Sequence, residues 1–204
     1  MRSLQIFAKV IKLVFLKADL FLARIFTRFK FMINGVDFKK SFVAKGVPVV
    51  NINLKGKFSI GENFVLHSGN YNLIGRQQPC YFIVGADAIL TIANNVGISC
   101  TAIVCHNRIS IGNNVKIGGN VCIYDTDFHS LIEDHRNAIP ENKSTIKTKP
   151  VVIQDGVFIG AHSIILKGVT IGEKAIIGAG SVVSKDIPAN QIWAGNPAKF
   201  IKDI

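Results

Sequence analysis

The sequence is poor in residues that would cross-link a chain or bind a metal through paired thiols. Its 204 residues include four cysteines, and none of them forms a CxxC pair. All four lie in repetitive, strand-like sequence, so we interpret them as free, buried thiols of a protein in a reducing compartment. This interpretation favours a cytoplasmic protein and applies to Cys80, Cys100, Cys105 and Cys122.

Acidic residues are also scarce, and the basic residues are unevenly distributed. The chain carries 24 Lys and Arg against 13 Asp and Glu, a net charge of +11. Residues 1–45 hold ten of these bases and two acids, Asp19 and Asp37, so this segment alone carries +8. A basic end favours an anionic partner such as a membrane surface, a substrate or a nucleic acid. No DNA- or RNA-binding motif is evident, so we expect no nucleic-acid partner.

Long uncharged runs are missing as well, and none approaches the ~20 residues that a membrane-spanning helix needs. Residues 3–30 are instead expected to form an amphipathic helix with one basic face. Lys9, Lys12 and Lys17 also interrupt the apolar core that a secretory signal would need. We expect the helix either to lie on an anionic bilayer or to pack on its own domain or at a subunit interface. Its apolar positions are Leu4, Phe7, Ile11, Phe15, Leu22, Ile25 and Phe29.

What the sequence has in abundance is a six-residue repeat. Every sixth residue from 153 to 183 is aliphatic, and the fifth position of successive hexads is small or β-branched. Self-similarity at a fixed short period is typical of a solenoid. The aliphatic series are Ile153, Ile159, Ile165, Ile171, Ile177 and Val183; Ile111, Ile117 and Ile123; Ile92, Ile98 and Val104; and Leu54, Ile60 and Leu66.

A period of six fits neither a helix nor a long alternating strand. It fits short strands of about four or five residues joined by tight corners, with an aliphatic side chain of each face directed inward. Glycine supplies the geometry of the corners. The segment 130–150 contains no hexads and is rich in Asn, Glu, Lys and Pro, so we expect a loop extruded from the coil.

Three stretches resemble the hexapeptide-repeat acyltransferases, in the branch of the maltose and galactoside O-acetyltransferases. They are DTDFHSL at 125–131, GVFIGAHSIILKGVTIGEKAIIGAGSVVSKDIP at 156–188 and WAGNPAKFI at 193–201. The resemblance implies a mainly β fold, a left-handed parallel β-helix behind the N-terminal amphipathic helix. It divides the chain into a basic helical segment at 1–44, a β-helix domain at 45–188 and a C-terminal tail at 189–204 that contributes to the CoA site. It also implies a homotrimer with active sites between subunits.

Titratable residues interrupt the repeat at one place. The aliphatic register of the series ending at Ile123 next reaches His129, and the preceding Val position is Asp127. A histidine does not fill an aliphatic column without partners, so we expect the coil to open here and His129 to face a cleft. An imidazole suits the general base of acyl transfer, and the resemblance gives this role to His129. Asp127 or Asp125 would orient the imidazole, or else cap a turn.

Other residues are expected around this base. Asp125 and His106 are candidates for contact with the acceptor substrate. Ser130 stands where many sugar acetyltransferases of this branch have proline, so the resemblance leaves the acceptor open. No nucleophile is evident, so we expect direct attack in a ternary complex, with backbone N–H groups near Gly160 and Ala161 stabilising the oxyanion.

The implied acyl donor is acetyl-CoA, and no metal is expected. Glycines would permit close approach of the backbone, and lysines would meet the phosphates; corner geometry and ordinary surface charge are the alternatives. Trp193 either packs on the last coil or flanks the adenine. The resemblance assigns CoA binding to Gly160, Ala161, Gly178, Ala179, Ser184, Lys185, Lys199 and Lys202.

The sequence therefore predicts an acetyl-CoA-dependent O-acetyltransferase acting on a sugar hydroxyl. The basic helix suggests a surface-polysaccharide precursor, modified in the cytoplasm or at the inner membrane face. An N-acetyltransferase on an amino sugar is the nearest alternative. A metal lyase like the gamma-class carbonic anhydrases would need convergent histidines, for which His106, His129 and His135 are available. A non-catalytic scaffold that keeps the coil is the remaining alternative.

Overall fold

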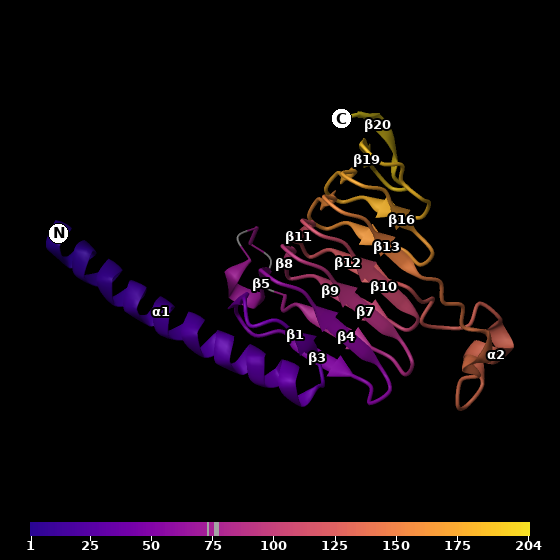
Figure 1. The fold of residues 1–204 in the computed structure, drawn as a ribbon, viewed down its shortest axis with the longest axis horizontal. Coiled ribbons are helices and arrows are strands. Elements are labelled where there is room, and N and C mark those ends of the chain that lie inside the picture. The colour runs from indigo at the N-terminus through magenta and orange to yellow at the C-terminus, as the bar shows by residue number, and fades with distance from the viewer. Residues whose placement is uncertain (73, 76–77) are drawn as a thin grey trace.

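Three parallel sheets form the walls of a column of stacked coils (Figure 1). The computed structural model describes residues 1–72, 74–75 and 78–204. From β1 to β18 the chain visits sheets A, B and C in turn, so each coil contributes one strand to each, and β19 and β20 then both join sheet B. Sheet A contains β1 (Asp37–Phe38), β4 (Lys57–Ile60), β7 (Ile89–Ile92), β10 (Arg108–Ile111), β13 (Val151–Ile153) and β16 (Thr170–Ile171).

The other two sheets continue the same winding. Sheet B contains β2 (Phe42–Lys45), β5 (Phe64–His67), β8 (Gly97–Ser99), β11 (Lys116–Gly119), β14 (Phe158–Ile159), β17 (Ile176–Ile177), β19 (Gln191–Ala194) and β20 (Lys199–Asp203). Sheet C contains β3 (Val49–Ile52), β6 (Tyr81–Val84), β9 (Ala102–Cys105), β12 (Cys122–Tyr124), β15 (Ile164–Ile165) and β18 (Val182–Val183). The helices are α1 (Arg2–Ile33) and α2 (Glu133–Asn137), with 3-10 helices η1 (Gly69–Tyr71) and η2 (Lys143–Thr145).

Strand pairing follows the six-residue repeat. Ile159 of β14 lies opposite Ile177 of β17, and Ile165 of β15 lies opposite Val183 of β18. Partners on adjacent coils are thus three hexads apart, which brings each sheet back above itself after one full coil. The predicted mainly β fold, a left-handed parallel β-helix with an N-terminal helix, is confirmed.

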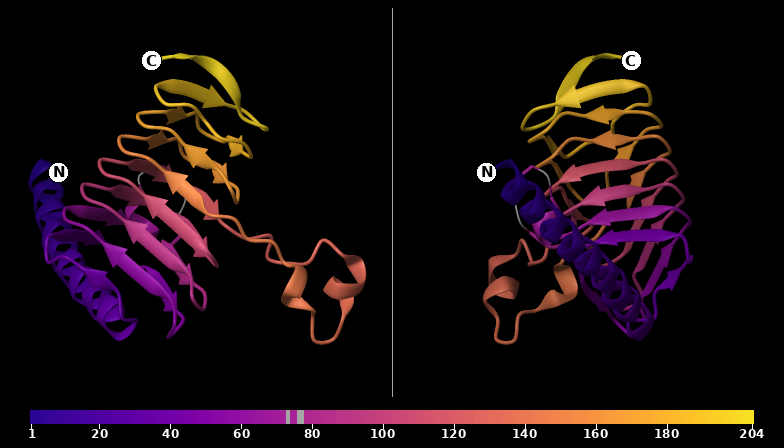
Figure 2. Two further views of the ribbon diagram at one scale, coloured as in Figure 1. Left: turned by 45° about the vertical axis from the view of Figure 1, so that its right-hand side comes forward. Right: turned by 90° about the vertical axis from the view of Figure 1, so that its left-hand side faces the viewer.

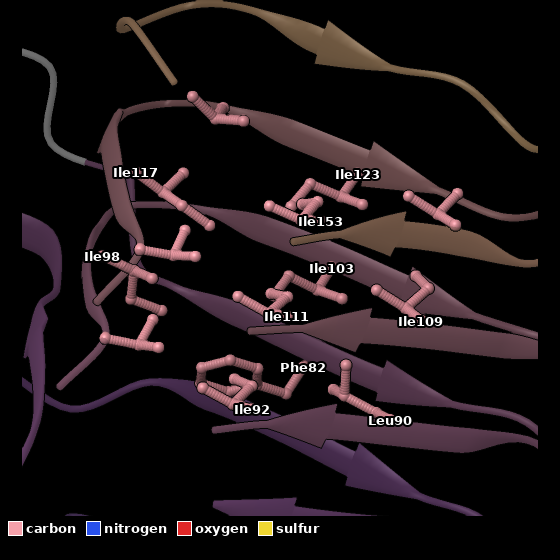
Figure 3. Packing of buried hydrophobic residues seen from close by; sticks show 14 of the residues in the cluster. Phe82, Leu90, Ile92, Ile98, Ile103, Ile109, Ile111, Ile117, Ile123 and Ile153 are labelled. Atoms are coloured by element: carbon pink, nitrogen blue, oxygen red, sulfur yellow. The ribbon is translucent and has the colours of Figure 1, made fainter. Parts of the chain in front are cut away.

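The aliphatic columns of the repeat fill the interior of the coil (Figure 3). Ile103, Ile123 and Ile165, on adjacent strands of sheet C, are all 0% exposed, and Phe82 extends their column toward the N-terminal coils. Burying a side chain of this size contributes about 1.5–3 kcal/mol. Because every coil repeats this burial, the packed interior holds the turns between the strands in place.

Glycine at the corner between sheets B and C is required by coil spacing. A Cβ added to Gly160 would lie 2.5 Å from the backbone N of Ala179 on the next coil. A Cβ added to Gly118 would lie 2.5 Å from the backbone N of Ala161. Side chains at these two positions would therefore push adjacent coils apart.

Helix α1 extends slightly beyond the predicted range 3–30. Its C-terminal part lies against the first coils (Figure 2). Ala23, Thr27 and Phe31 are buried there, whereas all residues before Leu20 are exposed. Packing on its own domain therefore accounts for the C-terminal part of the helix only. Within residues 1–72, 74–75 and 78–204, no helix is both long and apolar enough to cross a membrane.

The first coil begins earlier than the boundary at residue 45 suggested. β1 pairs with β4 and β2 with β5, although β1 and all of β2 but Lys45 lie within the segment 1–44, which was expected to be helical. The ring of Phe31 in α1 lies 5.5 Å from that of Phe38 and 5.8 Å from that of Phe42. Because these aromatic residues replace the aliphatic hexads, the six-residue pattern does not mark this coil.

The extruded loop leaves the column after β12 and returns at β13 (Figures 1 and 2). Its two ends are joined by an antiparallel bridge between Thr126 and Thr148. The backbone N–H of Lys149 also donates to the carbonyl oxygen of Asp125 at 2.9 Å. This short ribbon closes the loop at its base, directly beside the polar stretch DTDFH.

Candidate active site

The first acid of the polar stretch, Asp125, lies in the core. It is 0% exposed and takes the inward position that Cys105 holds one coil earlier. Its two carboxylate oxygens accept the backbone N–H groups of His106 and Asn107, at 2.7 and 2.8 Å. The expectation that Asp127 replaces a core residue was therefore wrong by two positions. Asp125 caps the turn after β9. We had expected it instead to contact the substrate or to orient the imidazole.

This buried carboxylate also acts on its neighbour. Burial, reinforced by the negative charge of Asp125, raises the pKa of the Cys105 thiol to about 12. A thiol with such a pKa stays protonated at neutral pH and is a poor nucleophile. The sequence neighbours Cys105 and His106 therefore do not form a reactive pair.

Asp127 lies outside the column and pairs with a lysine of the next coil. Its Oδ1 contacts Nζ of Lys167, and its Oδ2 is buried with no hydrogen-bond partner among the described residues. Its backbone carbonyl accepts the N–H of His129 at 2.7 Å, in a turn where Phe128 has a φ of 64°. Asp127 thus shapes the backbone that carries His129, while its carboxylate is directed to Lys167.

His129 is turned outward, and 68% of its side chain is exposed. Its Nδ1 lies 3.1 and 3.3 Å from the two carboxylate oxygens of Glu141, which also accepts the backbone N–H of Ser130 at 3.2 Å. The hydrogen bond with His129, and to a smaller extent that from Ser130, holds the pKa of Glu141 below its ordinary value. An ionised carboxylate can only accept a hydrogen bond, so this contact requires a proton on Nδ1 of His129. In the neutral imidazole, Nε2 is then the acceptor nitrogen.

Sequence reasoning missed Glu141. The residue lies 12 positions beyond His129, in a segment without any repeat that could fix its place. The sequence feature that could have pointed to this part of the loop was Ser130, a polar residue directly after His129. This serine is buried, its Oγ lies 2.7 Å from Oγ1 of Thr145, and the same oxygen accepts the N–H of Ile132 at 3.0 Å. Ser130 therefore ties the returning part of the loop to the residue next to His129.

The other candidate histidines, His135 and His106, contact different side chains. Nδ1 of His135 lies 2.9 Å from Oγ1 of Thr145 inside the loop, and the ring of His106 lies 6.4 Å from that of Phe128. Over the described ranges, no group of three or more His, Cys, Asp or Glu is arranged to hold a metal ion. The three histidines considered for a metal lyase thus do not form a ligand set in this part of the chain.

The carboxyl ends of the sheet C strands form one edge of the column. His106 follows β9, His129 follows β12, Lys167 follows β15, and Ser184 and Lys185 follow β18. These strands are neighbours in one parallel sheet, so the residues line up along the edge, one coil apart. The structure therefore brings the predicted base and two predicted CoA-binding residues to the same edge.

The other predicted CoA-binding residues of the coil lie across sheet C. Ala161 and Ala179 stand at the corner where the chain passes from sheet B into β15 and β18. At the same corner, the backbone N–H of Gly160 donates to the carbonyl oxygen of Ile177 at 2.7 Å. This N–H is therefore not available to an oxyanion, so of the two N–H groups expected to stabilise it, only that of Ala161 stays a candidate. The N–H of Gly178 is likewise bonded to a backbone carbonyl.

The C-terminal tail folds back as an antiparallel hairpin of β19 and β20. Trp193 packs against the core, and its ring lies 6.3 Å from that of Phe200, so it packs on the last coil as one of the two alternatives foresaw. Lys185, Lys199 and Lys202 are exposed and make no ion pair with any described residue. The end of the column thus presents unpaired positive charge.

Comparison with known proteins agrees with this architecture. Residues 150–185 match the sequence model described as bacterial transferase hexapeptide (six repeats). The chain is 36% identical over 152 residues to the galactoside O-acetyltransferase of Lactococcus lactis subsp. lactis, a match covering 74% of this chain and 66% of that protein. It is 35% identical over 128 residues to the galactoside O-acetyltransferase of Escherichia coli K12, covering 63% and 60%.

The matches span less than two thirds of the length of these relatives. Among solved structures, AntD, an N-acyltransferase from Bacillus cereus in complex with dTDP and 3-hydroxybutyryl-CoA, aligns with a TM-score of 0.66. The alignment covers 84% of this chain and 85% of AntD at 23% identity, and it shows a shared fold. The repeat, the stacked coils and these relatives together establish that the chain belongs to the hexapeptide-repeat acyltransferase family.

Proposed function

We propose that this protein is an acetyl-CoA-dependent acetyltransferase that acetylates a sugar hydroxyl, with His129 as general base. The observation that carries the proposal is the exposed imidazole whose Nδ1 is held by Glu141. This arrangement leaves Nε2 free of any described partner and directed away from the carboxylate. Asp127 serves as a positioning residue, because its backbone carbonyl bonds the N–H of His129.

The chemistry follows from this tautomer. The acceptor hydroxyl gives its proton to Nε2 of His129 as its oxygen bonds to the thioester carbonyl carbon. The carbon–sulfur bond then breaks, and the imidazolium returns the proton to the departing sulfur. Glu141 stabilises the imidazolium between these two transfers. A general base of this kind contributes about 10²–10⁴ in rate.

The buried thiols support direct transfer in a ternary complex. Burial raises the pKa of both Cys80 and Cys105 to about 12, and it also raises the pKa of Cys100. The thiolate is the nucleophilic form of cysteine, and these residues are kept from forming it. A covalent acyl-enzyme on any of these three cysteines is therefore disfavoured.

The charges at the end of the column suit the acyl donor. Acetyl-CoA supplies the activated acetyl group and carries several phosphates, which exposed lysines without ion pairs would bind as point charges. We assign this role to Lys185, Lys199 and Lys202. Ser184 and the small residues Ala161 and Ala179 would line the path of the pantetheine arm, together with Gly160 and Gly178.

The arrangement of these residues supports a homotrimer. Ala161 and Ala179 lie at the entry edge of sheet C, and His129 follows the exit edge. In an assembly that sets the entry edge of one subunit against the exit edge of the next, both groups would face one cleft. The loop around Glu141 would then border the acceptor in that cleft.

A sugar acceptor is supported by the relatives, two of which are galactoside O-acetyltransferases. AntD, which shares this fold, is an N-acyltransferase, so an amino sugar is the second candidate acceptor. We place the reaction in the cytoplasm, on a precursor of a surface polysaccharide.

The test is CoA release from acetyl-CoA with a panel of galactosides, amino sugars, and nucleotide- and lipid-linked sugars. His129→Ala should lower kcat by about 10²–10⁴. His67→Ala, which removes a histidine from β5 in sheet B, is the matched control and should leave kcat within about twofold of wild type, far below the effect of losing a general base. An acceptor-dependent rate that survives His129→Ala would refute the role of this residue. Mass analysis of the product separates O-acetyl from N-acetyl transfer.

A further inference from the structure

The contact between α1 and the column fixes which side of the helix faces outward. Ala23, Thr27 and Phe31 recur every four residues and are buried against the first coils. The ring of Phe31 lies 5.8 Å from that of Phe42 and 6.3 Å from that of Phe82, so the helix is anchored in the aromatic core of the column.

Polar contacts add to this anchor. Nζ of Lys30 donates to the carbonyl oxygen of Pro48 at 2.9 Å, and the hydroxyl of Tyr71 donates to the carboxylate of Asp19. The guanidinium of Arg24 lies 6.0 Å from the ring centre of Phe42. The two hydrogen bonds lie on one flank of the buried stripe and the contact of Arg24 lies on the other. Contacts on both flanks oppose rolling of the helix, so its outer face has a fixed direction relative to the column.

That outer face is apolar along the whole helix. At about 100° per residue, Ile25 and Phe29 point away from the stripe of Ala23 and Thr27. Apolar residues at spacings of three and four continue this face to both ends of α1. The exposed residues of the face are Leu4, Phe7, Ile11, Val14, Phe15, Phe21, Leu22, Ile25, Phe29, Met32 and Ile33.

The borders of the apolar face are positively charged. Lys17, Arg24 and Arg28 lie along one border and Lys12 along the other, whereas α1 contains one acidic residue, Asp19. Long basic side chains beside an apolar face can reach lipid headgroups while their stems and the apolar residues sit deeper. Two copies of this helix placed face to face would instead bring borders of like charge together, which opposes self-association.

We propose that the outer face of α1 docks the protein on the surface of an anionic lipid bilayer, with the helix in the plane of the interface. The face is wider than the narrow seam of a coiled coil, and it runs along most of the length of α1, which is about 48 Å. Because α1 is anchored to the first coils, docking holds the N-terminal end of the column next to the bilayer and the C-terminal coils away from it (Figure 1). This proposal does not depend on the acetyltransferase activity.

The test is flotation of the full-length protein with phosphatidylcholine vesicles, with and without phosphatidylglycerol. Phe15→Glu places a carboxylate in the outer face, and Leu13→Glu makes the same change of charge on the opposite side of the same turn; both residues are exposed. We expect Phe15→Glu to lower the partition coefficient by about 50-fold or more, from lost apolar burial and charge together. Leu13→Glu changes only the local charge and should lower it by about fivefold or less.

Three results would overturn the proposal. The first is an equal loss of vesicle binding in the two variants. The second is equal binding of wild type to vesicles with and without phosphatidylglycerol. The third is a fall in solution mass for Phe15→Glu without any loss of vesicle binding, which would identify a second copy of the chain as the occupant. Circular dichroism of both variants checks that α1 and the column remain folded.

Discussion

Replacing Glu141 by glutamine tests how the loop controls His129, the proposed base. In the proposed mechanism, the carboxylate keeps the imidazole proton of His129 on Nδ1, 3.1 Å away, and the lone pair on Nε2. In Glu141→Gln, the amide nitrogen can take the place of the oxygen now 3.1 Å from Nδ1 and donate to it. The imidazole would then carry its proton on Nε2 and could no longer accept one there.

The size of the effect depends on solvent access. In a buried catalytic triad, replacing the carboxylate beside histidine by an amide costs about 10⁴ in kcat. Here 68% of the histidine side chain is exposed, so water can partly replace the lost partner. We therefore expect Glu141→Gln to lower kcat by about 10- to 100-fold, and Glu141→Ala by less, because water would leave both tautomers accessible.

The assay is steady-state CoA release across pH 6–9 with the best acceptor from the panel. The matched control is Glu133→Gln, which removes the same charge from an exposed site in the same loop. A KM that stays unchanged while kcat falls would identify an effect on the base. If Glu141→Gln and Glu133→Gln give the same kcat within about twofold, the assigned tautomer is wrong, since loss of the base effect costs at least tenfold.

Two further predictions concern the column. Gly160→Ala should lower the free energy of unfolding, measured by urea titration, by about 1–3 kcal/mol, because the new Cβ overpacks against Ala179. Gly180→Ala should lower it by less, because nothing lies within 4 Å of that position and only its φ of 70° opposes a side chain. A larger loss in Gly180→Ala than in Gly160→Ala would contradict the packing argument. Hydrogen bonds from Asn113 hold the pKa of Asp155 below its ordinary value, so the stability they add is present above about pH 4 and is lost as the pH falls further. The melting temperature of Asp155→Asn should therefore fall less steeply in acid than that of wild type, and parallel curves would rule this contribution out.

Much of the fold was predictable because it repeats. Each hexad contributes an inward aliphatic residue, so Ile153 to Val183 specify their own register without information from distant segments. The helix α1 was predictable for the same reason, since its apolar spacing is local. The first coil escaped prediction because Phe38 and Phe42 take the place of aliphatic residues and depend on Phe31 from the helix.

The candidate site was less predictable because its contacts are not periodic. The hexad count reached His129 but put Asp127 in the core, whereas the buried acid is Asp125. The difference arises because Asp125 bonds the backbone of the turn one coil earlier, an interaction that spacing along the chain does not encode. Glu141 reaches His129 only because the loop folds back on Ser130.

The loop between β12 and β13 is inserted without disturbing the wall on either side. Ile123 pairs with Ile165 across the insertion in the same register that Ile165 keeps with Val183 on the next coil, where no insertion intervenes. The length and sequence of the loop can therefore change without altering the coils on either side of it. Exchanging this loop for that of a relative should therefore leave the pairing of β12 with β15 and of β15 with β18 unchanged.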